Sequence, residues 1–260
     1  MVSGPRREAH MRKGNPVLWT AALLAGLLLS LPALSAASGL QVTPLRVHLD
    51  EDTPAAALTL RNHGDRSRVI QTEVVHWTQE EGEDIHAPTD EVLVTPPIFT
   101  VEPGESQVVR VAHAGRNADS TRAVEQAYRI YLQESPPPTE GDGARLQVIL
   151  RLGVPLFVAP EGGERPDLRW TVHALESGGL EIRAENLGNI HAHVQELRVA
   201  TRDPETGEQQ VATLGTHRYL LPGQSSHWHL GQEADWGDAA RLDLSAITPR
   251  GALNAEIEME

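Results

Sequence analysis

The stretch Arg145–Pro160 reads RLQVILRLGVPLFVAP and decides the fold. It is nearly uncharged and prone to β-structure, which favours an extended strand. Hydrophobic side chains recur at every second position, so they share one face of that strand: Leu146, Val148, Leu150, Leu152 and Val154. At a sheet edge, the strand would offer this face and a free backbone ladder to another polypeptide; inside a sandwich it would only be core.

The sequence before this stretch shows almost no helical periodicity. Short β-type runs are separated by turn residues such as Asn62-His63-Gly64-Asp65 and Pro103-Gly104. About seven strands are expected, which is the number and spacing of an immunoglobulin-like sandwich. Their expected ranges are Leu40–Leu49, Ala56–Arg61, Arg68–Thr78, Val92–Val94, Gln107–Val111, Ala127–Gln133 and Leu146–Val158.

The sequence after this stretch predicts a second domain. Residues 159–167 contain glycine, proline and charged residues with nothing to bury, so they are interpreted as a hinge. A second series of β-type runs follows over residues 168–260. We therefore expect an all-β chain with an N-terminal sandwich domain over residues 38–158 and a smaller one over 168–260.

The N-terminus predicts export. A basic segment ending at Lys13 precedes an apolar run over Val17–Leu31, and mostly small residues follow as far as Ser38. This order is typical of a secretory signal peptide, here residues 1–37, with cleavage expected after Ala36 or Ala37. The expected location is the periplasm, and an uncleaved membrane anchor is the alternative.

The composition excludes several functions. The formal net charge of -14 argues against nucleic acid as a partner. The absence of cysteine excludes thiol catalysis and thiolate metal sites. Lys13 is the only lysine, so every fixed cationic side chain of the mature protein is an arginine.

Motifs for catalysis are missing, so we expect no enzyme, no cofactor and no metal. The sequence contains no G-x-S-x-G elbow, no H-E-x-x-H and no phosphate-binding glycine loop. The pairs His191/His193 and His227/His229 each place two imidazoles on one strand face, which is the one pattern that could bind zinc or copper. No further ligand lies at a telling spacing, so half-buried or surface histidines are the preferred interpretation.

An ordered set of segments resembles a known family, the PapD-like periplasmic pilus-assembly chaperones of the chaperone–usher pathway, and is closest in style to the archaic, spore-coat-U-type branch. The matching segments are Val42–Val47, Leu58–Asn62, Trp77, Val94–Pro97, Val101–Arg110, Tyr128–Pro136, Leu146–Pro160, Asn186–His191 and Tyr219–Gly223.

The resemblance implies two immunoglobulin-like domains in an L or boomerang arrangement and a function without ATP. A chaperone of this family lends a strand to a pilin that lacks its own last strand, which is a form of β-strand addition. The implied donor residues are Leu146, Val148, Leu150 and Leu152. The implied partners are pilus or coat-type subunits and an outer-membrane usher, and self-dimerisation of the free chaperone is a further expectation.

The resemblance also implies an anchor for the carboxylate at the C-terminus of the subunit. The arginine of the family's first strand matches Arg46, whereas the family's lysine is replaced by Pro155. Arg110 and Glu125 match positions for which the resemblance implies a structural ion pair. Ala159 stands where the main branch has an arginine that forms a salt bridge between the domains.

Two other classes of function remain open from the sequence alone. One is a secreted β-sandwich structural subunit or adhesin, which an apparently complete last strand disfavours. The other is a periplasmic metal- or carbohydrate-binding module, and an aromatic content of 4% weakens its sugar-binding form.

Overall fold

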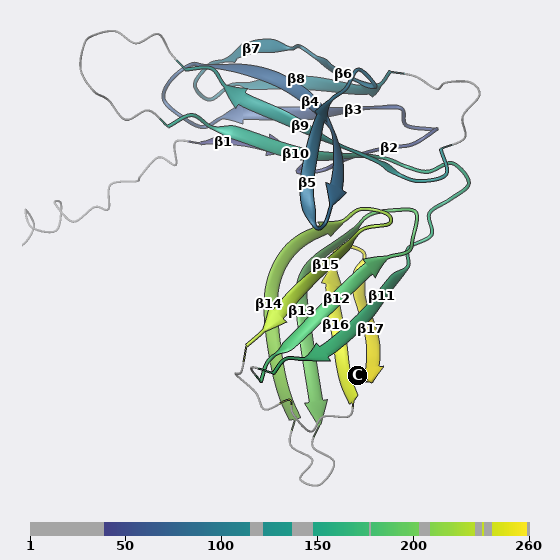
Figure 1. The fold of residues 1–260 in the computed structure, drawn as a ribbon. Helices are drawn as coiled ribbons and strands as arrows, with labels where there is room; N and C mark the ends of the chain where they lie inside the picture. Colours follow the sequence, from purple (N-terminus) through teal and green to yellow (C-terminus); the bar gives the residue numbers. More distant parts are fainter. Residues whose placement is uncertain are drawn as a thin grey trace, which may run out of the picture. The chain divides into compact units, whose positions relative to one another are not determined.

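The computed structural model describes residues 39–114, 122–136, 148–176, 178–202, 209–231, 236 and 241–258. Every regular element among these residues is a β-strand, which confirms the predicted all-β class (Figure 1). The described part of the chain accordingly contains no helix able to span a membrane. The predicted signal peptide, residues 1–37, lies outside the described residues.

The first sandwich consists of two sheets. One sheet has the order β1 (Leu40–Thr43), β3 (Ala55–Asn62), β8 (Ser106–His113) and β6 (Val92–Thr95). The other has the order β2 (Val47–Leu49), β10 (Arg151–Val158), β9 (Gln126–Glu134), β4 (Arg68–Glu80) and β5 (Glu83–Pro88), and β7 (Ile98–Val101) also pairs with β4. All of these pairs are antiparallel except β2 with β10, which is parallel.

The first core is formed by apolar side chains that recur on the inward face of each strand. On β9, Tyr128, Ile130 and Leu132 are fully buried and pack with Leu58 and Leu60 of β3 on the facing sheet. Burying each such side chain contributes roughly 1.5–3 kcal/mol relative to leaving it exposed. The core therefore needs no disulfide, in agreement with a chain that has no cysteine.

The segment expected as one strand over Leu40–Leu49 forms two strands in different sheets. β1 pairs with β3, whereas β2 pairs with β10. Pro44 follows β1 directly, and its missing N–H cannot continue a ladder. Arg46 therefore lies in the bend that links β1 to β2 rather than within a strand.

The strand expected over Leu146–Val158 is shorter among the described residues. β10 begins at Arg151, which pairs with Gln133 near the end of β9. Val148 and Ile149 belong to no strand and pair with none among the described residues. Leu146 lies outside the described residues.

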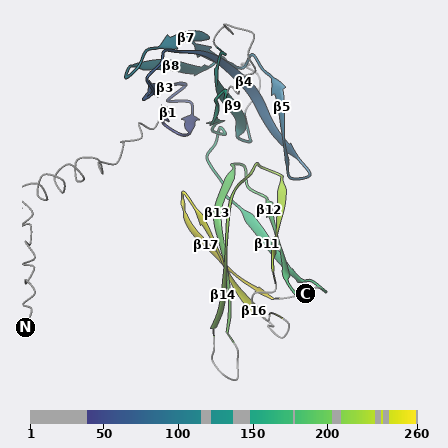
Figure 2. The same ribbon diagram turned by 90° about the vertical axis from the view of Figure 1, so that its left-hand side faces the viewer.

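The second sandwich is also made of two sheets. One has the order β11 (Leu168–Ala174), β12 (Leu180–Asn186) and β15 (Ser225–Leu230). The other has the order β14 (Gln209–Leu220), β13 (Ala192–Arg202), β16 (Arg241–Thr248) and β17 (Gly251–Glu258). Figure 2 separates the two layers, and Trp228 and Trp236 are buried in the core between them. β11 and β17 are edge strands of different sheets.

The hairpin of β4 and β5 projects beyond the neighbouring strands of the first sandwich (Figures 1 and 2). The side-chain amide of Gln79, near its tip, donates to the carbonyl of Tyr219 at 2.9 Å. Its oxygen accepts from the N–H of Leu221 at 2.9 Å. The hairpin thus makes a specific pair of hydrogen bonds to the second sandwich.

Candidate functional site

Strand β10 has one bonded edge and one partly open edge. The N–H of Glu134 donates to the carbonyl of Leu150 at 2.8 Å, so even-numbered residues direct their backbone groups toward β9. The N–H of Ala159 donates to the carbonyl of Leu49 at 2.8 Å, so odd-numbered residues direct theirs toward β2. Because β2 pairs only with Leu156–Val158, no described strand covers the odd-numbered groups before Pro155.

Pro155 marks the end of this open edge. Its position is odd, so the N–H that proline lacks would have pointed away from β9. Proline occurs in sheets at such edges, where the missing donor breaks no existing ladder. The open part of the edge therefore comprises the backbone groups of Arg151 and Gly153.

The predicted donor residues differ in their surroundings. Leu152 packs against the first core, and Leu150 is half-buried beside the end of β9. Val148 continues the same even-numbered face but is 73% exposed. Ile149 next to it is also exposed, so an apolar segment without a covering strand leads into the open edge.

Arg46 lies where the two sandwiches meet. Its Nη2 donates to Nδ1 of His193 at 2.9 Å and to the hydroxyl oxygen of Tyr219 at 3.0 Å. Its Nε is buried without a hydrogen-bond partner. No ion pair joins Arg46 to a carboxylate among the described residues, so its charge is held only by neutral groups.

His193 cannot supply a second positive charge at neutral pH. Burial, and then the charge of Arg46, lower the pKa of His193 to about 4. Its Nδ1 accepts from Arg46, so the proton of the neutral ring is on Nε2. The ring stacks on Tyr219 with 4.0 Å between centroids, which fixes both acceptors of the guanidinium.

Glu125 connects the first sandwich to the second through His191. Its Oε1 accepts from the backbone N–H of His191 at 2.9 Å and lies 2.7 Å from the Nδ1 of the same residue. Both side chains are at most 3% exposed. The expected ion pair between Arg110 and Glu125 is wrong: Arg110 is exposed on β8, and the described residues show no contact between the two. Glu125 is instead paired with His191 of the second sandwich.

Aromatic rings pack around this pair. Phe157 of β10 stacks on His191 with 3.6 Å between centroids, and Trp77 of β4 meets Tyr219 edge to face at 5.3 Å. The sequence analysis preferred half-buried or surface positions for His191 and His193 over metal binding, but it did not predict their contacts with Glu125 and Arg46. The nearby Asn186 is the sequence signal that could have indicated buried positions for these histidines. Its buried side-chain amide donates to the carbonyls of Ile190 and Leu220 and fixes the turn that precedes His191.

Arg129 was not singled out from the sequence. It is the cross-strand neighbour of Pro155, the position where the resemblance implies a lysine. Its guanidinium carbon lies 3.9 Å from the centroid of a Trp77 ring and 5.8 Å from that of Tyr219. Asp84 lies 3.5 Å away and partly neutralises its charge.

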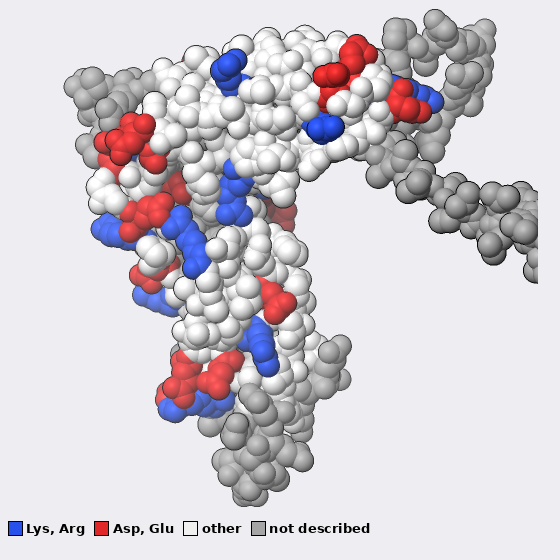
Figure 3. Space-filling model, turned by 180° about the vertical axis from the view of Figure 1, so that it is seen from behind, with Lys and Arg blue, Asp and Glu red and all other residues white. Residues whose placement is uncertain are grey.

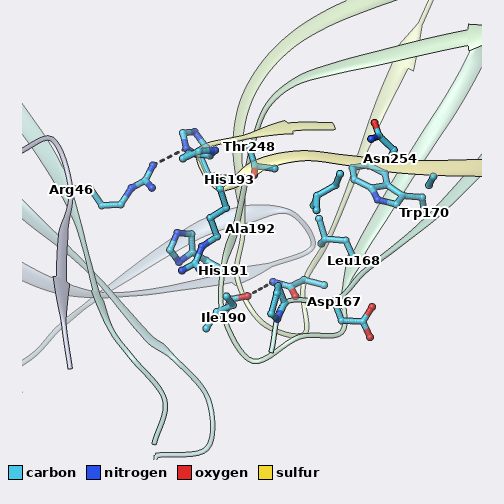
Figure 4. Close-up of a pocket in the computed structure, with 16 residues that line it drawn as sticks. Arg46, Asp167, Leu168, Trp170, Ile190, His191, Ala192, His193, Thr248 and Asn254 are labelled. Carbon is cyan, nitrogen blue, oxygen red and sulfur yellow. Dashed lines mark hydrogen bonds between the residues drawn. The ribbon is translucent and has the colours of Figure 1, made fainter. Parts of the chain in front are cut away.

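A cavity of about 410 Å³ adjoins Arg46 (Figure 4). Its polar lining includes Arg46, His193 and Arg250, and its apolar lining includes Leu168, Trp170 and Leu253. Arg250 is paired with Glu164, which raises the pKa of the guanidinium and lowers that of the carboxyl. Arg46 is therefore the cation of this group that lacks a counter-charge.

The histidine pairs do not form a metal centre among the described residues. No group of three or more His, Asp or Glu side chains is placed there to hold an ion. His227 and His229 do share a strand face, with 5.5 Å between their centroids, but the partner of His229 is the single carboxylate of Glu181.

The charged surface also gives no support to nucleic-acid binding. On the face shown in Figure 3, basic side chains of the described residues lie beside acidic ones, without an extended basic area. A polyanion would require such a single-sign surface.

Comparison with known proteins shows the fold and a domain family that matches the first sandwich. Residues 39–164 match the family described as the pili and flagellar-assembly chaperone, PapD N-terminal domain. Chaperone protein FimB/FhaD of Bordetella pertussis is 32% identical over 156 residues. That alignment covers 56% of this chain and 60% of the relative, which is less than two thirds of its length.

Solved structures resemble the described chain over most of its length. A chain in the CsuC–CsuE chaperone–tip adhesion subunit pre-assembly complex, from archaic chaperone-usher Csu pili of Acinetobacter baumannii, has a TM-score of 0.59 and 19% identity, covering 85% of this chain and 99% of that one. The CupB2 chaperone of Pseudomonas aeruginosa has a TM-score of 0.56 and 18% identity, covering 85% and 100%. These structures show a shared fold of two immunoglobulin-like sandwiches. The chain is therefore similar to the PapD-like pilus-assembly chaperones, whose N-terminal domain family matches residues 39–164.

Proposed function

We propose that this protein is a periplasmic chaperone that holds pilus or coat-type subunits by strand addition and passes them to an outer-membrane usher. The observation that carries the proposal is the open edge of β10 before Pro155, with the exposed Val148 and Ile149 leading into it. A subunit with an unfilled groove can bond to this edge and bury the even-numbered side chains of the same segment. Leu146, Val148, Leu150 and Leu152 are the proposed donor residues.

The proposed anchor for the subunit is Arg46. Its guanidinium carries a charge without a carboxylate partner among the described residues, and a carboxylate can accept two parallel hydrogen bonds from such a group. The terminal carboxylate of the subunit would supply the missing counter-charge. Arg129, beside Pro155, is the proposed source of the second positive charge.

Pilus chaperones of this family are periplasmic. For this chain we propose export by a signal peptide over residues 1–37, cleaved after Ala36 or Ala37. The basic segment, the apolar run and the small residues before Ser38 support this route.

The double change Val148→Asp with Leu150→Asp tests strand donation. It places two charges on the face that would enter the apolar groove, so the chaperone should recover little or none of a co-expressed small secreted subunit from the same organism. The measurement is the amount of soluble subunit that co-purifies from the periplasm. Recovery equal to that of the unchanged protein would refute strand donation.

A matched control uses two exposed apolar residues of the other sheet. Leu93→Asp with Val108→Asp adds the same charge on the outer face of β6 and β8. This control should leave subunit recovery unchanged, because that face contributes nothing to the open edge of β10.

A further inference from the structure

The cavity beside Arg46 lies at an open side of the second sandwich, between the edges of its two sheets. β11 and β17 are edge strands of different sheets, and no hydrogen-bonded ladder joins them. Leu168 and Trp170 of β11 line one side of the resulting opening, and Leu253 and Ala255 of β17 line the other. An apolar cleft between two sheet edges therefore ends at a guanidinium of the first sandwich.

The charges around the cavity favour a ligand with one negative charge at one end. Arg46 has a buried Nε without a partner and no ion-paired carboxylate among the described residues, whereas Glu164 already neutralises Arg250. Asp167 also lines the cavity, but at the end away from Arg46 (Figure 4). The anionic group of a ligand would consequently lie against Arg46 and the apolar group beyond it.

The size of the cavity fits a small apolar group rather than a folded partner. A volume of about 410 Å³ is near the lower end of the roughly 300–1,000 Å³ that ligand pockets span. Such pockets are mostly apolar with a few polar groups that set orientation, and this lining has that character.

We propose that this cavity binds the last residue of the client polypeptide and selects an apolar or aromatic side chain there. The terminal carboxylate meets Arg46, and the side chain lies between Leu168, Trp170 and Leu253. The inference rests on the proposed role of Arg46 and adds a determinant of client choice that is separate from the donor strand. Carboxylate recognition and side-chain recognition use different residues, so they can be tested separately.

The experiment measures binding of short synthetic peptides to the exported full-length protein by isothermal titration calorimetry. Three hexapeptides share their first five residues: one ends in Phe, one ends in Ser, and one ends in Phe with an amidated terminus. The free Phe terminus should bind about 10- to 100-fold more tightly than the Ser terminus, as expected for burial of a large apolar side chain. Amidation of the Phe peptide should weaken its binding by at least the same factor.

Three variants distinguish recognition of the terminal side chain from recognition of the terminal carboxylate. Leu253→Asp should remove the preference for Phe, because it places a carboxylate in the apolar lining. Val211→Asp is the matched control, since Val211 is 41% exposed and Leu253 is 42% exposed on the same sheet. This control should keep the preference. Arg46→Gln should weaken the Phe and Ser peptides by the same factor.

The outcomes separate this inference from the proposed anchor. Equal binding of the Phe and Ser peptides, with amidation still harmful, would reject the side-chain pocket alone. Binding that is insensitive both to amidation and to Arg46→Gln would reject the carboxylate anchor. No binding of any peptide at millimolar concentration would reject both, and decanoate binding as tightly as the Phe peptide would reassign the cavity to a lipid-like ligand.

Discussion

At the scale of single residues, Glu125 and His191 form a buried hydrogen-bonded pair between the two sandwiches. One carboxylate oxygen serves both the backbone N–H and the ring nitrogen of His191, and the two side chains are almost fully buried. Nearby, Nε of Arg122 donates to the carbonyl of Ala159 at 2.8 Å, so a cation also lies at this junction. A buried acceptor that satisfies two donors stabilises the contact between Glu125 and His191, because leaving either donor unpaired costs free energy.

Replacing Glu125 by Leu should lower the free energy of unfolding by about 2–3 kcal/mol, because two buried donors of His191 lose their acceptor. Glu125→Gln should cost less, since its amide oxygen can still accept from the backbone N–H. Urea unfolding followed by circular dichroism measures both. Glu73→Leu is the control, because its exposed pair with Arg151 contributes only about 0–1 kcal/mol. A loss for Glu125→Leu no larger than that of the control would contradict this role.

At the scale of elements, β10 uses one edge to bond within the first sandwich and leaves part of its other edge open to a partner. Even-numbered backbone groups bond to β9, and odd-numbered groups face the open edge. Gly153→Pro should therefore spare the ladder to β9 but remove one donor from the open edge, weakening subunit binding about fivefold, the equivalent of roughly 1 kcal/mol. Gly153→Ala is the matched control, because it adds the same Cβ, 3.2 Å from Cε1 of Tyr131, and keeps the N–H. Affinity is measured with the co-purifying subunit, and equal values for both variants would contradict a bonded edge.

The same elements show what the sequence could and could not predict. Alternation was enough to predict most strands of both sandwiches, because buried and exposed positions differ by several kcal/mol in each strand. It failed at β5, whose six residues are all exposed, so neither face of the strand is buried. It also failed at Leu40–Leu49, where Pro44 divides one apolar run between two sheets.

The candidate site was less accessible to sequence reasoning because long-range contacts assemble it. Arg46 was identified through resemblance, but its acceptors His193 and Tyr219 lie 147 and 173 positions away. No local pattern indicates that a histidine will accept from an arginine at such a separation. The same reason explains why the contact of His191 with Glu125 and the cavity between β11 and β17 were not predicted.

At the scale of the whole molecule, cationic chemistry after export depends on arginine alone. Lys13 is the only lysine among the 260 residues and lies within the proposed signal peptide. Arginine keeps its charge at every physiological pH and binds carboxylates through two parallel hydrogen bonds. Removal of residues 1–37 would therefore leave the α-amino group as the single primary amine of the protein.

Reductive dimethylation of the protein purified from the periplasm tests this consequence. Intact mass spectrometry should find one labelled amine, on a chain that begins at Ala37 or Ser38, because cleavage removes Lys13 together with the original N-terminus. A variant that blocks processing, Ala36→Arg with Ala37→Arg, should instead retain Lys13 and show two labelled amines in the membrane fraction. Two labelled amines in the unchanged protein would show that residues 1–37 remain attached and act as an anchor. Because Lys13 is the only lysine and precedes the expected cleavage site, one measurement decides between a free periplasmic chaperone and a membrane-tethered one.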